Sequence, residues 1–429
     1  MENITTLQEH LERANEARAQ GKYWQAIQHY TDYLSATVPE SVGLVHDLRL
    51  EALVQRGDLL HQLGEPEAAL AGYNQYYLEA GSSEQAVDAL VRIGEQQANM
   101  GDYYAALDAH REALHLAEAL NITAGRAKAL KGMGSAMMHV GRTEEAAENL
   151  RRALALFSQL GDDFEAMRAW NTLGITYSFM GAPDKAIQAY KEALQTARTV
   201  GERQTALTLS NIGECFQDLY NLDQALQYHQ EALEIAESLK LESVRADLRR
   251  NLGADLCLLG RLDEGLPMLY RSLEISRAMS DPEVEMQALF SLTWAELRNE
   301  RPDVAFLHAS QLLTLSEQHK TRLHRARALH VLGLYHFDQG EIVAAQEMWQ
   351  RALFLAHETN QRLLLWRIHA NMAKVAPNEA LAAVHWRIAG EVVQQILEPI
   401  EDQDLRQGFL DFPLVNEVLA HLPAGALLI

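Results

Sequence analysis

Several features that define common protein classes are scarce in this chain of 429 residues. It has two cysteines, Cys215 and Cys257, without any metal-binding spacing, so we expect ordinary buried thiols rather than a disulfide framework. Ten prolines and no Ser/Gly-rich linker argue against long disordered stretches. No apolar run is long enough to cross a bilayer, and the N-terminus does not have the pattern of a signal peptide. We therefore expect a cytoplasmic protein with no membrane partner.

Basic residues are also in deficit. The chain has 37 Lys and Arg against 59 Asp and Glu, which gives a formal net charge of -22. Such a surface repels phosphate backbones unless a local basic patch intervenes. The composition therefore predicts no nucleic-acid partner.

Motifs that carry chemistry are missing as well. The sequence contains no HExxH, GxSxG or GxxxxGK[ST] pattern. The stretch KGMGSAMMHVG, from Lys131, has two glycines of a nucleotide loop but lacks the final glycine and a preceding strand. Steps of six scatter His324, His330 and His336 around a helix instead of along one face. We predict no catalytic residues, no metal site and no cofactor.

What the sequence does contain is a repeat. One small residue recurs nine times with intervals of 37 to 43 residues, most of them 40. The members of this column are Ala26, Ala69, Ala106, Ala146, Ala186, Ala225, Gly265, Ala305 and Ala345. Each interval reads as two amphipathic helices joined by a short break, so the chain is predicted to be an array of helical hairpins.

A second column of small residues precedes each break by seven positions. Its members are Gly57, Gly94, Gly134, Gly174, Gly213, Gly253, Thr293 and Gly333. Small residues allow the two helices of a hairpin to approach closely while large neighbours fill the remaining space. The break itself is usually glycine, which suits a helix end with positive φ. Tyr220 and Glu300 replace that glycine, and we expect tighter or more strained turns there.

The stretch LGITYSFMGAPDKAIQAYKEAL, within residues 171–197, resembles the tetratricopeptide repeat. A 40-residue period is similar to the variant in kinesin light chains, LGN-type scaffolds and sensor regions of bacterial regulatory ATPases. The resemblance implies an all-α, right-handed superhelical solenoid of about nine hairpins. We expect the solenoid to span residues 1–376 and a C-terminal helical cap to span residues 377–429, because a solenoid must cover its last apolar face.

The resemblance also indicates a binding face. When the packing glycine is counted as position 8 of its helix, positions 2, 5, 6 and 9 line the concave groove of such proteins. In this chain these positions are acidic near the N-terminus, basic and asparagine-rich in the middle, and aromatic towards the C-terminus. The candidate partner-binding residues are Lys128, Lys131, Arg168, Asn171, Asn211, Arg250, Asn251 and Trp294.

Two functions follow as expectations. The first is a non-catalytic scaffold or adaptor that holds an extended peptide or a helix of a partner protein in the groove. Lys131 and Asn211 match single positions of the carboxylate clamp of chaperone-binding relatives, although Ser135 replaces one of its asparagines. The alternative is a sensor whose superhelix changes shape when it binds a small peptide or metabolite, and which controls a separate effector. The apolar tail HLPAGALLI is expected to dock on the cap; its insertion into a neighbouring copy, giving self-association, is the other outcome.

Overall fold

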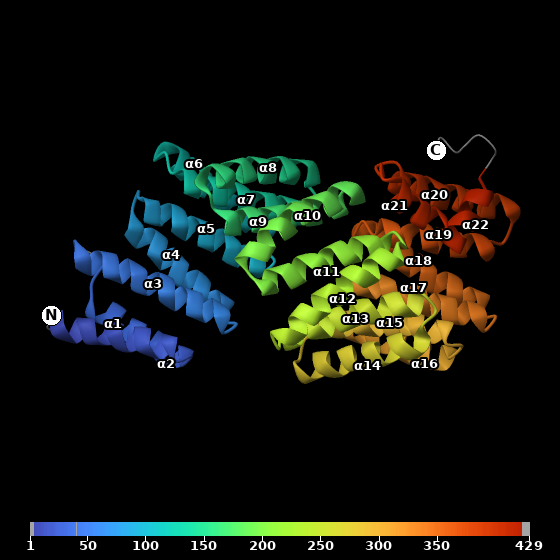
Figure 1. The fold of residues 1–429 in the computed structure, drawn as a ribbon, viewed down its shortest axis with the longest axis horizontal. Helices are drawn as coiled ribbons and strands as arrows, with labels where there is room; N and C mark the ends of the chain where they lie inside the picture. Colours follow the sequence, from blue (N-terminus) through green and yellow to red (C-terminus); the bar gives the residue numbers. More distant parts are fainter. Residues whose placement is uncertain (1–3, 40, 423–429) are drawn as a thin grey trace. The chain divides into compact units, whose positions relative to one another are not determined.

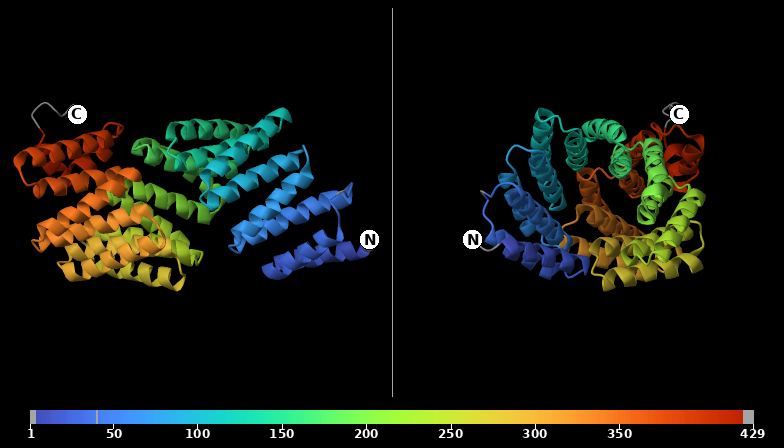
Figure 2. Two further views of the ribbon diagram at one scale, coloured as in Figure 1. Left: turned by 180° about the vertical axis from the view of Figure 1, so that it is seen from behind. Right: turned by 60° about the vertical axis from the view of Figure 1, so that its left-hand side comes forward.

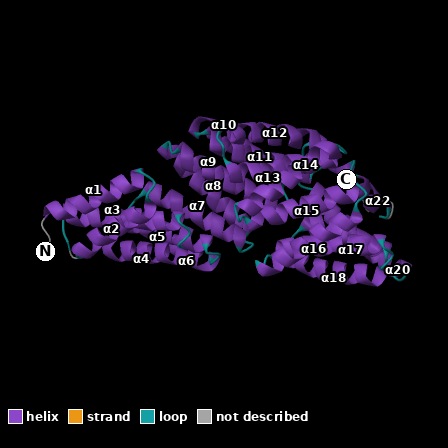
Figure 3. Cartoon of the chain, turned by 90° about the horizontal axis from the view of Figure 1, so that it is seen from below, coloured by secondary structure: helices purple, strands orange, loops and turns teal. Residues whose placement is uncertain are grey.

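In the computed structural model, residues 4–39 and 41–422 are described, and these residues form 22 helices and no strand. Figure 3 shows the helices joined by short loops. No helix among the described residues is long and apolar enough to cross a membrane. Both cysteines are buried thiols, as predicted.

The chain divides into two units, and each is treated by itself. Unit 1 spans Met1–Phe179. Its helices are α1 (Ile4–Ala19), α2 (Tyr23–Ala36), α3 (Leu44–Gln62), α4 (Pro66–Ala80), α5 (Glu84–Asn99), α6 (Tyr103–Ala119), α7 (Thr123–His139), α8 (Thr143–Leu160) and α9 (Asp163–Phe179).

Unit 2 spans Met180–Ile429. Its helices are α10 (Pro183–Val200), α11 (Glu202–Asp218), α12 (Leu222–Ser238), α13 (Glu242–Leu258), α14 (Leu262–Ala278), α15 (Pro282–Arg298), α16 (Pro302–Gln318), α17 (Arg322–Asp338), α18 (Ile342–Glu358), α19 (Arg362–Lys374), α20 (Glu379–Leu397), α21 (Gln403–Leu410) and α22 (Pro413–Ala420). The predicted boundary after residue 376 falls between α19 and α20 and stays a prediction.

The repeat columns correspond to helical hairpins. Within each unit, a helix with the glycine column is followed by a helix with the alanine column, and the two pack side by side (Figures 1 and 2). The predicted all-α class with repeated hairpins is therefore confirmed. The turns also agree with the prediction, because the break glycines have positive φ, as do Tyr220 at 57° and Glu300 at 55°. A left-handed conformation of a residue with a Cβ costs about 1–2 kcal/mol, so these two turns are strained.

The glycine column makes room for a bulky side chain of the second helix. A Cβ on Gly57 would lie 2.6 Å from Cε1 of Tyr73, and one on Gly333 would lie 2.3 Å from Nε1 of Trp349. Repeat 8 has Thr293 in this column, and there the matching position of the second helix holds the small Ala309. Most hairpins thus place a small residue opposite a large one, whereas the α15–α16 hairpin places two small residues at these positions.

In unit 1, a buried ion pair secures the long link after the first hairpin. Nε and Nη2 of Arg49 donate to the two carboxylate oxygens of Glu79 at 2.6 and 2.9 Å. Nη1 of Arg49 also donates to the main-chain oxygens of Leu34, at 2.6 Å, and Thr37, at 2.9 Å. Burial opposes the charged form of Glu79, but the hydrogen bonds from Arg49 and Gln75 outweigh it and lower the pKa of this carboxyl.

In unit 2, the C-terminal elements return to the first helices of the same unit. The main-chain N–H groups of Glu401 and Asp402 donate to Oδ2 of Asp184, at the beginning of α10, the second of them at 3.0 Å. The ring of Phe412, just before α22, stacks on Tyr220, with 3.7 Å between ring centroids and 3° between ring planes. The two ends of unit 2 are therefore in direct contact, although nearly two hundred residues separate Tyr220 from Phe412.

Candidate functional site

Unit 2 contains a cavity of about 230 Å³, which we call the inner pocket. It is lined by residues of α11, α13, α15 and α19, by the turn after α11, and by the segment that begins α22. The lining residues are Gln217, Asp218, Tyr220, Ala254, Cys257, Leu258, Phe290, Ser291, Trp294, Ala295, Arg298, Arg367, Phe412 and Leu414.

The floor of the inner pocket consists of one continuous stripe on successive first helices of the hairpins. Phe290, Ser291 and Trp294 occupy positions 5, 6 and 9 of α15, which belong to the face predicted to line the groove. Leu258 and Arg298 lie at position 13 of their helices, one turn further along the same stripe. Phe290 and Trp294 meet edge to face with their centroids 6.4 Å apart, so the floor is aromatic.

The outer wall of the pocket comes from the contact between the ends of unit 2. Arg367 of α19 donates to the hydroxyl of Tyr220, and its guanidinium lies 5.6 Å from the centroid of the Tyr220 ring. Phe412 covers the other face of that ring. Phe409 adds a second contact, with its ring centroid 6.0 Å from that of Tyr220. The strained turn at Tyr220 thus directs an aromatic side chain to the place where the C-terminal segment docks.

Three arginines near the pocket form no close salt bridge with any described residue, although Arg327 and Arg367 lie near enough to Asp218 to interact with its charge. Arg298, Arg327 and Arg367 form no ion pair within the described part of the chain. Arg298 donates only to the main-chain oxygen of Leu258, at 3.3 Å. The guanidinium of Arg327 lies 5.1 Å from the centroid of the Phe290 ring.

Asp218 is the acidic group of the pocket. The Asp218 side chain reaches solvent, but partial burial in the pocket disfavours the charged carboxylate. This burial, together with the negative charge of Glu214, raises the pKa of Asp218 to about 6. Arg327 and Arg367 act in the opposite direction and favour the carboxylate. Cys257 is unsuited to nucleophilic chemistry, since burial raises the pKa of its thiol to about 11.

In unit 1, the structure brings two of the predicted basic residues together with acids. Nζ of Lys131 is buried, 2.5 Å from Oε2 of Glu165 and 3.6 Å from Oε1 of Glu95. Arg168 contacts the same two acids, at 3.0 Å to Glu165 and 3.9 Å to Glu95. These carboxylates neutralise most of the predicted basic patch. Lys128, half-buried on α7, forms no ion pair with any described residue.

The other predicted residues divide between contacts within the protein and the pocket. Asn171 is half-buried on α9, and Asn211 is half-buried on α11. Arg250 donates to Asp247 at 2.7 Å, and the fully buried Asn251 donates to Glu214 at 2.9 Å. Only Trp294 of the eight lines the inner pocket. A partner-binding role of these eight residues stays a prediction.

Several pocket residues were not anticipated. Gln217, Leu258 and Arg298 would follow if the groove stripe were continued by i+3 and i+4 steps beyond position 9. The sequence marks Tyr220 as exceptional, since it replaces the turn glycine, but does not indicate that it lines a pocket. Nothing in the sequence pattern points to Arg367 or Phe412, because only the contact between the two ends of unit 2 brings them to the pocket.

With this geometry in view, the chain falls into the class of all-helical repeat proteins. Residues 125–199 and 165–238 each match the family model described as tetratricopeptide repeat. The stretch from residue 125 to residue 238 therefore consists of tetratricopeptide repeats, which confirms the resemblance found in the sequence.

Curated relatives match only parts of the chain. The Tonsoku-like protein of Mus musculus is 27% identical over 205 residues, which is 44% of this chain and 15% of that protein. Tetratricopeptide repeat protein 29 of Trypanosoma brucei brucei is 29% identical over 117 residues, covering 27% of this chain and 24% of that protein. The chain therefore spans no more than a quarter of the length of these relatives.

Solved structures share the fold at low sequence identity. The apo form of the quorum sensor NprR from B. thuringiensis has a TM-score of 0.60 at 12% identity, covering 82% of this chain and 99% of that chain. A Rap protein complexed with competence and sporulation factor has a TM-score of 0.52 at 14% identity, covering 93% and 100%. A signal transduction ATPase with a tetratricopeptide repeat sensor from Pyrococcus horikoshii has a TM-score of 0.55 at 13% identity, covering 80% and 55%. These likenesses show the fold alone.

Proposed function

We propose that this protein is a non-catalytic, cytoplasmic peptide-binding protein, and that the inner pocket of unit 2 holds one large apolar side chain of the peptide. The observation that supports this most is the combination of an aromatic floor with arginines at its rim. Trp294 and Phe290 supply the apolar surface, and Arg298 and Arg367 supply donors beside it. Lys128, Arg168 and the predicted asparagines are further candidate contacts for the rest of a partner.

The size of the pocket favours a side chain over a whole metabolite. Pockets for drug-sized ligands typically have volumes of about 300–1,000 Å³. The inner pocket, at about 230 Å³, is smaller than that range. It suits an aromatic or branched side chain whose main chain runs outside the pocket, across the first helices of the hairpins.

The charges of the rim indicate which peptides fit. Guanidinium groups bind carboxylates with two parallel hydrogen bonds. Arg298 and Arg367 therefore suit an Asp or Glu side chain, or a C-terminal carboxylate, next to the apolar anchor. The solved structures of a Rap protein with a signalling factor and of a quorum sensor agree with a role of this kind.

The test is a phage-displayed library of random heptapeptides, selected on the full chain, followed by fluorescence anisotropy with the selected peptides. We expect the selection to enrich a large apolar residue next to an acidic one. Trp294→Ala should weaken binding at least about tenfold, since buried aromatic anchors dominate such interfaces. Arg298→Gln combined with Arg367→Gln should weaken binding of the acidic peptides only.

Trp24→Ala is the matched control, because Trp24 lies exposed on α2 of unit 1 with 57% of its surface accessible. Its removal should leave the affinity unchanged. Equal affinities of the Trp294→Ala variant and the wild type would show that the inner pocket is not the binding site.

A second function, that of a sensor, is favoured by one observation. The wall of the pocket is the contact between Tyr220 and Phe412, so an occupant would touch the cap as well as the repeats. If the protein is a sensor, a selected peptide should also change hydrogen–deuterium exchange in α20 and α21, which do not line the pocket. If it is a scaffold, exchange should change only in the helices that line the pocket, which are α11, α13, α15, α19 and α22.

A further inference from the structure

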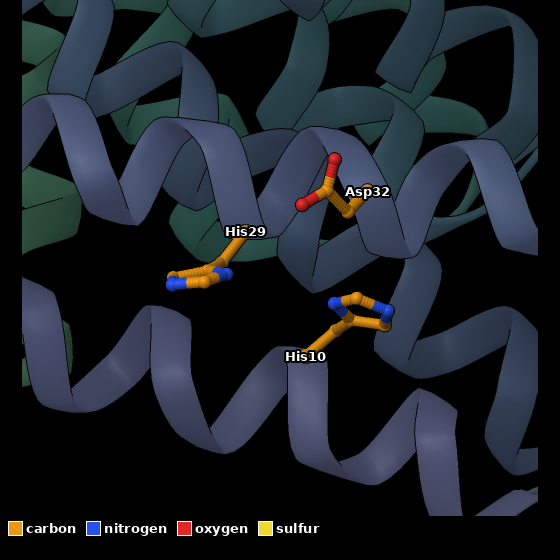
Figure 4. A group of neighbouring side chains, drawn as sticks. All are labelled: His10, His29 and Asp32. Atoms are coloured by element: carbon orange, nitrogen blue, oxygen red, sulfur yellow. The ribbon is translucent and has the colours of Figure 1, made fainter.

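Two histidines and an aspartate meet on the first hairpin of unit 1, and none of them belongs to the inner pocket. His10 lies on α1, and His29 and Asp32 lie on α2 (Figure 4). Each offers one ligand atom, and these atoms all lie within 4.8 Å of one another. His29 and Asp32 are three residues apart in the sequence, which places them on one face of their helix, turned towards His10.

We propose that these three side chains bind a divalent transition-metal ion of the zinc type. Two imidazoles and one carboxylate form a ligand set that Zn²⁺ accepts, with a water in the fourth position of a tetrahedron. Zinc ligands lie at about 2.0–2.2 Å from the metal, so neighbouring ligand atoms are about 3.4 Å apart. Small rotations of the three half-buried side chains would close the observed spacing to this value.

The surroundings of the ligands agree with a metal site. Nδ1 of His29 is buried without a hydrogen-bond partner among the described residues, although a buried nitrogen normally has one. Asp32 accepts a hydrogen bond at 2.8 Å from Nε2 of Gln28 and none from His29. An outer partner of this kind is what holds a ligating carboxylate in place.

The consequence for the fold is a cross-link within the α1–α2 hairpin. The ion would join α1 to α2 through His10 and His29, which are 19 positions apart in the sequence, beside the apolar contacts around Ala14 and Tyr30. The proposal differs from the sequence analysis, which predicted no metal site, because only the fold brings His10 to α2.

The test uses the full chain, stripped of metal with a chelator and titrated with ZnCl2 by calorimetry. Wild type should bind one zinc ion per chain tightly, and Mg²⁺ should not compete, because imidazole ligands disfavour it. His29→Ala should abolish this binding, and Asp32→Asn, which keeps the shape of the side chain, should weaken it at least tenfold. Gln28→Ala should weaken it about 10-fold to 100-fold as an outer partner.

Two further measurements make the result decisive. Zinc should slow hydrogen–deuterium exchange of α1 at least tenfold in the wild type and not in Asp32→Asn. His115→Ala is the control for non-specific uptake, since His115 is exposed on α6 of the same unit and should leave binding unchanged. The proposal would be overturned if the wild type did not bind zinc tightly. It would also be overturned if His29→Ala and Asp32→Asn bound zinc as tightly as the wild type.

Discussion

The side chain that lies opposite a helix-packing glycine determines what happens when that glycine is replaced. In the α3–α4 hairpin, a Cβ on Gly57 would overlap the ring of Tyr73, whereas a Cβ on Gly72 would meet only the Cα of Gly57, at 3.8 Å. Tyr73 cannot easily yield, since its hydroxyl donates to Asp58 at 2.7 Å. The two glycines of one hairpin therefore have different physical roles.

This difference predicts opposite effects of the same substitution. Gly57→Ala should lower the free energy of unfolding by about 1–3 kcal/mol through overpacking. Gly72→Ala should raise it by about 0.5–1 kcal/mol, because alanine favours the helix over glycine. Urea unfolding followed by circular dichroism measures both. Changes of the same sign would contradict the proposed role of the glycine column.

At the scale of an element, the two turns within hairpins that have Tyr220 or Glu300 in place of the break glycine offer a controlled comparison. Tyr220 and Glu300 have almost the same positive φ, but only Tyr220 contacts the C-terminal segment. Glu300→Gly should stabilise the protein by about 1 kcal/mol, since it removes the strain of a left-handed residue with a Cβ. Tyr220→Gly should remove the same backbone strain, but it also removes the stacking of the Tyr220 ring on Phe412.

Hydrogen–deuterium exchange distinguishes these outcomes. We expect faster exchange in α21 and α22 for Tyr220→Gly and no change there for Glu300→Gly. Phe412→Ala should reproduce the effect of Tyr220→Gly from the other side of the contact. Unaltered exchange of the cap in both Tyr220→Gly and Phe412→Ala would mean that other contacts hold it.

Local pattern predicts the elements of this protein well, because each hairpin is determined by contacts between neighbouring helices. The small-residue columns located the hairpins and their turns, including the strain at Tyr220. The same pattern located Trp294 on the inner face. It could not locate Arg367 or Phe412, which reach the pocket through contacts between distant parts of the chain. It also treated Lys131 as available to a partner, although Glu165 and Glu95 neutralise it.

At the scale of the whole molecule, buried histidines connect stability to pH. Burial lowers the pKa of His110 in unit 1 to about 4. In unit 2, burial lowers the pKa of His330 to about 3 and that of His369 to about 4, with Arg367 lowering the first further and His385 the second. In the unfolded chain these groups accept protons near pH 6.5. Below that pH the unfolded state binds more protons than the folded state.

Stability should therefore be greatest above pH 6.5 and decline as the pH falls towards 4. The decline should reach up to about 1.4 kcal/mol per pH unit for each histidine. Urea midpoints at pH 7.5, 6 and 5 measure it. His330→Gln should flatten this dependence, and His115→Gln, at an exposed site, should not. A midpoint that is constant between pH 7.5 and 5 would show that these histidines do not govern acid stability.

Glu79 adds a further loss of stability below about pH 4.5. Its pKa is lowered in the folded state, so the Glu79 carboxylate stabilises the fold only while it is charged.

The contact between the two ends of unit 2 has a consequence for how such a protein can evolve. In an open array, each repeat touches only its neighbours, so duplication or deletion can change the copy number one repeat at a time. Between α10 and α22 this freedom is lost. An extra 40-residue hairpin would carry Phe412 past Tyr220, and the main chain of Glu401 and Asp402 past Asp184. We therefore expect proteins descended from a common ancestor with this one to vary in repeat number outside unit 2 and to keep its length constant.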